Sequence, residues 1–159
     1  MTRVLVVALV LVLGACATSR PPPVFLPADA RLYDPGAGPF VALDRYRGRV
    51  VVFDFWAGWC AECRLAIPQV SRLADAFATA GLVVVGVNAG ESATDAAAYA
   101  RELGIGYPIA LDPDLGFSDR VGAGVPFVLV VDRNGAIAHR SRRIDPRTLG
   151  VIRTLLAPP

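Results

Sequence analysis

The fold of this chain is decided by residues 54–63, which read DFWAGWCAEC. An apolar, β-branched run at residues 50–53 precedes this stretch and predicts a buried strand. A helix is expected to run from about Cys60 to Gly81, a residue type that can end it. Cys60 then lies at a helix N-terminus, where free N–H groups and the helix dipole favour a thiolate. Cys63 lies one turn further on the same face, so the two thiols can form and reopen a disulfide.

The composition fits one globular domain with an N-terminal extension. The chain has 159 residues, of which 54% are hydrophobic and 19% charged, and its net charge is +2. This near-neutral balance gives no reason to expect a nucleic-acid partner. With three cysteines, at positions 16, 60 and 63, the chain does not fit a scaffold held together by several disulfides.

The first residues have the pattern of an export signal. Arg3 is followed by ten apolar residues from Val4 to Leu13, which is too short for a membrane-spanning helix but suits a signal peptide. The run ends in Leu-Gly-Ala before Cys16, which resembles the lipobox of bacterial lipoproteins. Residues 1–15 are therefore predicted to be a cleaved signal and Cys16 to be the lipid attachment site. The alternative is an ordinary signal peptide with an incidental cysteine. By the rules for lipoproteins, Ala17 would permit sorting to the outer membrane.

The region between the signal and the cysteine pair suggests a tether. Six of the 13 prolines fall between Ala17 and Phe40, without sustained periodicity. We therefore expect residues 16–39 to form a Pro-rich, semi-extended linker and residues 40–159 to form the folded domain. Residues 41–43 are predicted to form a short first strand.

The remainder of the chain alternates predicted strands with helices. Apolar strands are expected at residues 82–87 and 109–111, and a further one from Pro126 to Asp132. Asn134-Gly135 then signals a hairpin. The helices have recognisable starts, a capping box at residues 92–95 and the pair Asp145-Pro146. This order predicts an α/β domain with a mixed sheet.

Together these features resemble the TlpA/ResA/CcmG group of tethered, thioredoxin-fold thiol–disulfide oxidoreductases. The likeness covers about residues 40–157. It rests on the FWAxWCxxCR run, Pro68 after the cysteines, the segment Gly124-Val125-Pro126 before a strand, and the insert at residues 88–92. The resemblance implies a thioredoxin-like fold, in which a mixed central sheet is flanked by helices on both faces.

The resemblance also implies roles for single residues. Cys60 would be the exposed nucleophile and Cys63 the resolving thiol. Asp54 would be a buried general base for Cys63, with a pKa raised by burial; the alternative is an exposed acid on an edge strand. Pro126 would be cis and face the disulfide, or else a trans proline at a strand start.

Three further residues are candidates for substrate contact. The backbone of Val125 would pair with an extended substrate segment, and Trp59 would flank the thiols as an apolar docking surface. Glu91 would correspond to the acidic residue near the cysteines of cytochrome-maturation relatives, or else be a solvated acid at a helix start. Position 62 is Glu where most relatives carry proline, and the negative charge of Glu62 disfavours a thiolate on the nearby Cys60.

The function expected from these features is reduction of disulfides in exported proteins, with cytochrome c maturation as one setting. The protein is expected in the periplasm as a lipid-anchored monomer, with a disulfide-containing protein as substrate and a DsbD-like membrane protein as electron donor. The redox-active Cys60–Cys63 pair would serve without a cofactor or metal. The alternatives are a disulfide-forming oxidase and a Sco-type copper chaperone that uses His139, the single histidine. A peroxidase is disfavoured because no cysteine precedes the pair within the domain.

Overall fold

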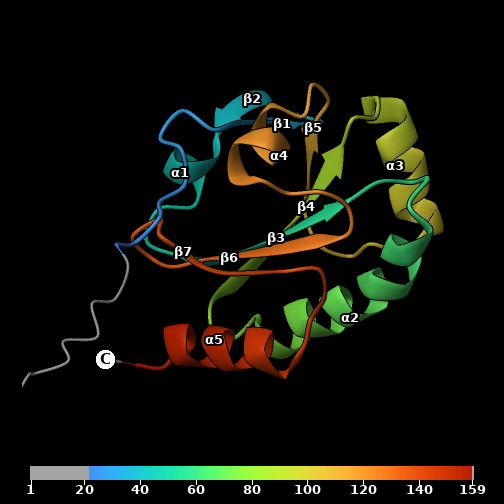
Figure 1. The fold of residues 1–159 in the computed structure, drawn as a ribbon. Helices are drawn as coiled ribbons and strands as arrows, with labels where there is room; N and C mark the ends of the chain where they lie inside the picture. Colours follow the sequence, from blue (N-terminus) through green and yellow to red (C-terminus); the bar gives the residue numbers. More distant parts are fainter. Residues whose placement is uncertain (1–21, 159) are drawn as a thin grey trace, which may run out of the picture.

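A computed structural model of the chain describes residues 22–158 and contains one mixed, seven-stranded sheet (Figure 1). The strand order is β2-β1-β5-β4-β3-β6-β7. The elements are β1 (Arg31–Asp34), β2 (Gly38–Val41), α1 (Ala42–Arg45), β3 (Val50–Trp56), α2 (Ala61–Phe77), β4 (Leu82–Ala89), α3 (Ala93–Glu102), β5 (Ile109–Asp112), α4 (Gly116–Val121), β6 (Phe127–Val131), β7 (Ile137–Ser141) and α5 (Pro146–Leu156).

The strand that leads to the cysteines lies in the middle of this sheet. Strand β4 pairs with β3 in parallel on one side and β6 in antiparallel on the other, and helices cover both faces, so every residue of β3 is buried. Its β-branched and aromatic residues suit a strand that is covered on both faces. A central strand of this kind holds the loop that follows it, residues 57–60, in a fixed position.

Helices cover both faces of the sheet, as predicted. In Figure 1, α2 and α5 lie below the sheet, and α1 and α4 lie above it. Side chains alternate along β3, so Val50 and Val52 pack toward α2 and α5, while Phe53 and Phe55 pack toward α4. The expected α/β class with a mixed sheet is thereby confirmed.

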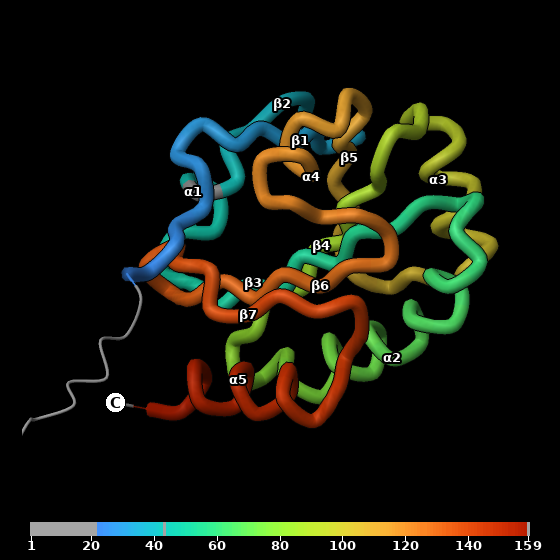
Figure 2. The backbone as a smooth tube through the Cα atoms, viewed as in Figure 1, coloured from blue at the N-terminus to red at the C-terminus, as the bar shows by residue number. Residues whose placement is uncertain are grey.

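The prediction that residues 16–39 form only a tether is wrong for the described part of that segment. Residues 24–26 run beside the β6–β7 turn (Figure 2), where Leu26 donates its backbone N–H to the carbonyl of Gly135 over 2.9 Å. Strand β1 then pairs with both β2 and β5. Leu26, Ala30 and Leu32 are buried in the core, so the folded domain begins near residue 24.

Other boundaries follow the sequence more closely. The strand predicted at residues 41–43 is instead the end of β2 followed by the short helix α1. Ser92 and Asp145 do start helices, since their side chains accept hydrogen bonds from the backbone N–H groups of Asp95 and Thr148. The Asn134-Gly135 turn joins β6 and β7 as predicted, and Gly135 has a φ of +85°.

The signal and lipidation predictions fall outside the described residues. Residues 1–15 and Cys16 both precede residue 22. Between residues 22 and 158, none of the helices has the length and apolar character needed to cross a membrane.

Candidate functional site

The two cysteines form a disulfide at the start of α2. Cys60 is the N-cap residue of this helix, and its Sγ accepts a 3.1 Å hydrogen bond from the backbone N–H of Cys63. The Cα atoms of the pair are 5.3 Å apart. In the reduced state, the same N–H groups and the helix dipole would stabilise negative charge on Cys60 more than on Cys63.

Neither sulfur is freely exposed. Cys60 retains 5% of its accessible surface and Cys63 retains 1%. Both pack in an apolar cluster with Trp56 and Ile67, and Val125 lies against this cluster. The prediction of an exposed Cys60 is therefore wrong in degree, because its neighbours leave only a narrow approach to the sulfur. Cys60 is nevertheless the more accessible of the two thiols.

Asp54 is a buried acid, as its proposed role requires. It lies near the middle of β3, in the same side-chain row as Val52 and Trp56, and is 2% exposed. Alternation along the strand directs its side chain to the same face as Trp56, which is the face covered by α2. Burial raises the pKa of Asp54 to about 6, and the hydrogen bond from Tyr107 acts in the opposite direction.

Sequence reasoning missed the partner of this acid. The hydroxyl of Tyr107 donates a 2.6 Å hydrogen bond to Oδ2 of Asp54. Tyr107 is buried in the segment between α3 and β5, and the hydrogen bond spans 53 positions of sequence. The available signal was an aromatic residue with a polar tip two residues before a short buried strand.

The Val125–Pro126 peptide bond is cis, as predicted. It lies just before β6, whose ladder with β3 begins at Phe127. Val125 is half-buried and directly precedes this ladder, and the pairing of its backbone with a substrate segment stays a prediction.

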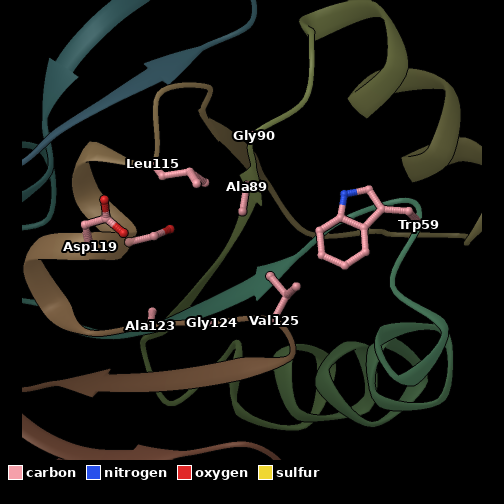
Figure 3. Close-up of a pocket in the computed structure, with 9 residues that line it drawn as sticks. Trp59, Ala89, Gly90, Leu115, Asp119, Ala123, Gly124 and Val125 are labelled. Atoms are coloured by element: carbon pink, nitrogen blue, oxygen red, sulfur yellow. The ribbon is translucent and has the colours of Figure 1, made fainter.

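Val125, which packs against the cysteine cluster, also borders a groove of about 510 Å³ whose lining includes Trp59, the residue before Cys60. Figure 3 shows the Trp59 ring and the Leu115 side chain on opposite sides of this groove, with Ala89 and Gly90 between them. Trp59 is 70% exposed, an unusual position for an indole ring. The groove is lined mainly by apolar residues, with Ser118 and Asp119 as its polar members, and its contact with a substrate stays a prediction.

Glu91 lies at the active-site loop and is not a freely solvated acid. Its Oε2 accepts a hydrogen bond from the backbone N–H of Gly58 at 2.9 Å and another from Nδ2 of Asn88 at 2.6 Å. The loop that carries Cys60 is thus tied to the segment that follows β4. Glu91 therefore holds the loop, whereas a direct contact with substrate stays a prediction.

A second tie to this loop was not foreseen. Arg64 donates to the carbonyl of Gly58 at 3.3 Å and to Oε1 of Glu102 in α3 at 2.6 Å.

Glu62 forms an ion pair of 3.5 Å with Arg142, and both side chains are about 70% exposed. Solvent screening makes an exposed pair of this kind weak, although Arg142 offsets part of the Glu62 charge.

His139 lies on β7, with its Nε2 3.2 Å from Oγ1 of Thr148 in α5. The part of the chain from residue 22 to 158 contains no cluster of three or more His, Cys, Asp or Glu side chains that could hold a metal ion.

Comparison with known proteins gives consistent matches. Protein DipZ of Mycobacterium tuberculosis is 37% identical over 114 residues, which are 68% of this chain but 16% of DipZ. HelX of Rhodobacter capsulatus, a thiol:disulfide interchange protein, is 33% identical over 125 residues, covering 70% of this chain and 68% of HelX. ResA of Geobacillus thermodenitrificans, a thiol-disulfide oxidoreductase, is 29% identical over 96 residues, covering 60% of this chain and 55% of ResA. The chain thus spans a small part of DipZ and about half of ResA.

The fold has a close structural counterpart. A Chlorobium tepidum protein assigned as the thiol:disulfide interchange protein DsbE superposes with a TM-score of 0.75 at 26% identity, over 85% of this chain and 97% of that one. The thioredoxin-like fold expected from the sequence is thereby confirmed. The profile of the AhpC/TSA family matches residues 29–140, a range that starts before the predicted domain boundary at residue 40. The chain therefore belongs to the AhpC/TSA family.

Proposed function

We propose that this protein is a thiol–disulfide oxidoreductase that reduces disulfides of exported proteins. The observation that carries the proposal is the position of the Cys60–Cys63 disulfide at the N-terminus of α2, with Val125 of the cis Val125–Pro126 bond packed against the cysteine cluster and lining a groove with Trp59. The names of HelX and ResA, which describe thiol:disulfide chemistry, support the same reaction.

The proposed cycle has two exchange steps. In the first, the Cys60 thiolate attacks one sulfur of the substrate disulfide, and the other substrate sulfur leaves as a thiolate that takes up a proton. In the second, Asp54 accepts the proton of Cys63, and the Cys63 sulfur attacks Sγ of Cys60. The substrate leaves with both sulfurs reduced, and the Cys60–Cys63 disulfide is formed. A dithiol donor then reduces this disulfide for the next cycle.

The setting is proposed from the N-terminal sequence. A signal at residues 1–15 and a lipid on Cys16 would hold the domain at a periplasmic membrane surface, with the inner or outer membrane as the location. A DsbD-like membrane protein is the proposed electron donor. An apocytochrome c is one substrate that fits, since its haem-binding cysteines must be reduced before haem attachment.

A mixed-disulfide trap tests the reaction. Cys63→Ser should retain the attack by Cys60 but prevent release, so a disulfide-linked substrate should accumulate on Cys60. Cys60→Ser is the matched control and should capture nothing. Equal capture by both variants would contradict the assigned roles.

A redox titration separates a reductase from an oxidase. We expect the Cys60–Cys63 couple to be more reducing than a glutathione buffer, because the Glu62 carboxylate opposes a thiolate at Cys60. A strongly oxidising couple, recovered as disulfide from cells, would favour the oxidase. Membrane fractionation of Cys16→Ser tests the lipid anchor. If Cys16 carries the lipid, the variant should leave the membrane fraction and lack the mass of the acyl chains.

A further inference from the structure

We propose that Tyr107 is a positioning residue for the exchange reaction, and that its hydroxyl holds the Asp54 carboxyl group in the orientation in which it takes the proton of Cys63. This inference rests on the proposed function. It assigns a task to a residue 53 positions from Asp54 in the sequence and outside the CxxC segment.

The Tyr107 side chain passes over Gly86 of the neighbouring strand, and its hydroxyl thereby reaches Asp54. Gly86 of β4 pairs directly with Asp54 of β3. A Cβ atom on Gly86 would lie 3.0 Å from Cε2 of Tyr107 and 3.0 Å from Nε1 of Trp56, closer than ordinary contact. The tyrosine ring therefore lies over the place where any other residue would put its side chain. The absence of a side chain at position 86 is what allows the contact.

The other surroundings of Asp54 are apolar or sulfur-containing. In the sheet, Asp54 lies between Gly86 of β4 and Val128 of β6. Helix α2 directs its buried residues Cys63, Ile67, Val70 and Leu73 to this face. Among the described residues, the titratable groups that pack on this face are the Tyr107 phenol, the cysteine pair and Tyr99 of α3, which lies against the cysteine cluster. The charged residues of α2, Glu62, Arg64, Arg72 and Asp75, are all exposed, and Arg64 is engaged by Gly58 and Glu102.

The hydrogen bond has two consequences for a proton acceptor. It engages Oδ2, which leaves Oδ1 as the oxygen free to take a proton. It also stabilises the carboxylate, so it lowers the pKa of Asp54 while burial raises it. Without the hydroxyl, burial would act unopposed, and a smaller fraction of Asp54 would be ionised at neutral pH.

The test is Tyr107→Phe, which keeps the ring and removes the donor. The Asp54 carboxyl group is titrated by carbon-13 NMR in the oxidised protein, and the release of a mixed disulfide is followed by stopped flow between pH 5 and 9. We expect the Asp54 titration to move up by about one pH unit, because hydrogen bonds to charged groups are among the stronger ones. Release at pH 7 should slow by up to about tenfold and recover as the pH is raised, whereas formation of the mixed disulfide should change little.

Tyr46→Phe is the matched control, since Tyr46 packs against the core on the opposite face of the sheet. It should leave both the titration and the pH profile unchanged. In an Asp54→Asn background, Tyr107→Phe should add no further slowing of release. An unchanged Asp54 titration in Tyr107→Phe, or equal slowing of release with and without Asp54, would overturn the inference. Inactivity of the wild-type protein toward any disulfide would instead overturn the proposed function, and the NMR titration would still decide whether Tyr107 controls Asp54.

Discussion

Glu91 and Gly58 connect two segments that are far apart in sequence, because the Glu91 carboxylate accepts a 2.9 Å hydrogen bond from the Gly58 N–H. Gly58 is buried and lies two residues before Cys60. A buried N–H group without an acceptor is costly, so this carboxylate satisfies a donor that the turn before α2 would otherwise leave unpaired. The geometry of the cysteine loop thus depends on a side chain that follows β4.

We predict that Glu91→Ala destabilises the fold by about 1–3 kcal/mol, since it removes the acceptor for Gly58 and Asn88. Glu91→Gln should lose less stability, because its amide oxygen can still accept a hydrogen bond from the Gly58 N–H. Denaturant unfolding and amide exchange at Gly58 would measure these effects. Asp75→Ala, at an exposed site on α2, is the control and should leave both unchanged. Normal exchange protection at Gly58 in Glu91→Ala would contradict the prediction.

Asp54 should make the stability of the oxidised protein depend on pH. Its pKa is raised to about 6 in the fold, against about 3.9 for an unfolded chain. The folded state therefore binds more protons between these values, and stability falls as the pH rises from about 4 to 6. Asp54→Asn removes this loss, so it should be more stable than wild type by about 2–3 kcal/mol at pH 8.

The advantage of Asp54→Asn should nearly vanish at pH 4, where Asp54 is protonated in the fold. Urea unfolding of both proteins at pH 4 and pH 8 would check this difference. A variant that is less stable than wild type at pH 8 would mean that the Asp54 carboxylate is stabilised in the fold.

Gly58 should not tolerate a side chain. A Cβ atom there would lie 2.0 Å from Cδ2 and 2.2 Å from Cγ of the Tyr99 ring. Gly58→Ala must displace this ring and should cost about 1–3 kcal/mol in the free energy of unfolding. At Gly106 a Cβ atom would meet nothing within 4 Å, so Gly106→Ala should change stability by no more than about 0.5 kcal/mol. Equal effects of the two substitutions on thermal unfolding would refute the argument.

The two reduced thiols should differ in reactivity. Cys60 has the greater exposure, 5% against 1%, and the helix N-terminus favours its thiolate. Limiting iodoacetamide near neutral pH should therefore label Cys60 first, as measured by peptide mass mapping. Labelling of Cys63→Ser should match that of wild type, while Cys60→Ser should react slowly. Faster labelling of Cys63 would reverse the two roles.

The N-terminal segment should be required for folding. A chain that starts at residue 40 lacks β1 and loses the buried side chains of Leu26 and Leu32. Their burial contributes about 3–6 kcal/mol, which is comparable to the stability of a whole domain. Circular dichroism should show cooperative unfolding for residues 22–159 but not for residues 40–159. Cooperative unfolding of residues 40–159 would instead support the domain boundary predicted at residue 40.

The sequence was sufficient for those parts of the site that depend on local chemistry. The strand before Cys60, the helix after it and the proline at position 126 each have a pattern within a few residues. The burial of Asp54 was harder to predict, since alternation permitted an exposed position. It follows from the central place of β3 between β4 and β6 and from the packing of α2 over that face, which bring together segments from different parts of the chain.

Two features had no adequate local signal. The contact of Tyr107 with Asp54 depends on Gly86, and neither position is informative alone. Residues 24–39 are rich in proline, which suggested a linker. Yet Leu26 pairs with the turn at Gly135, and Tyr33 pairs with Leu111 of β5. Partners so distant in sequence cannot be inferred from composition.

The pairing of residues 24–26 with the β6–β7 turn also limits how far the domain could stand from a membrane. If Cys16 carries a lipid as proposed, the free span ends at about Val24 instead of Phe40. At roughly 3.5 Å per residue, the maximum reach shrinks from about 84 Å to about 28 Å. The described chain begins at the left of Figure 1, while the first turn of α2 lies at the right. A short tether at this end would keep the domain close to the bilayer, with the disulfide on the side that faces away from it.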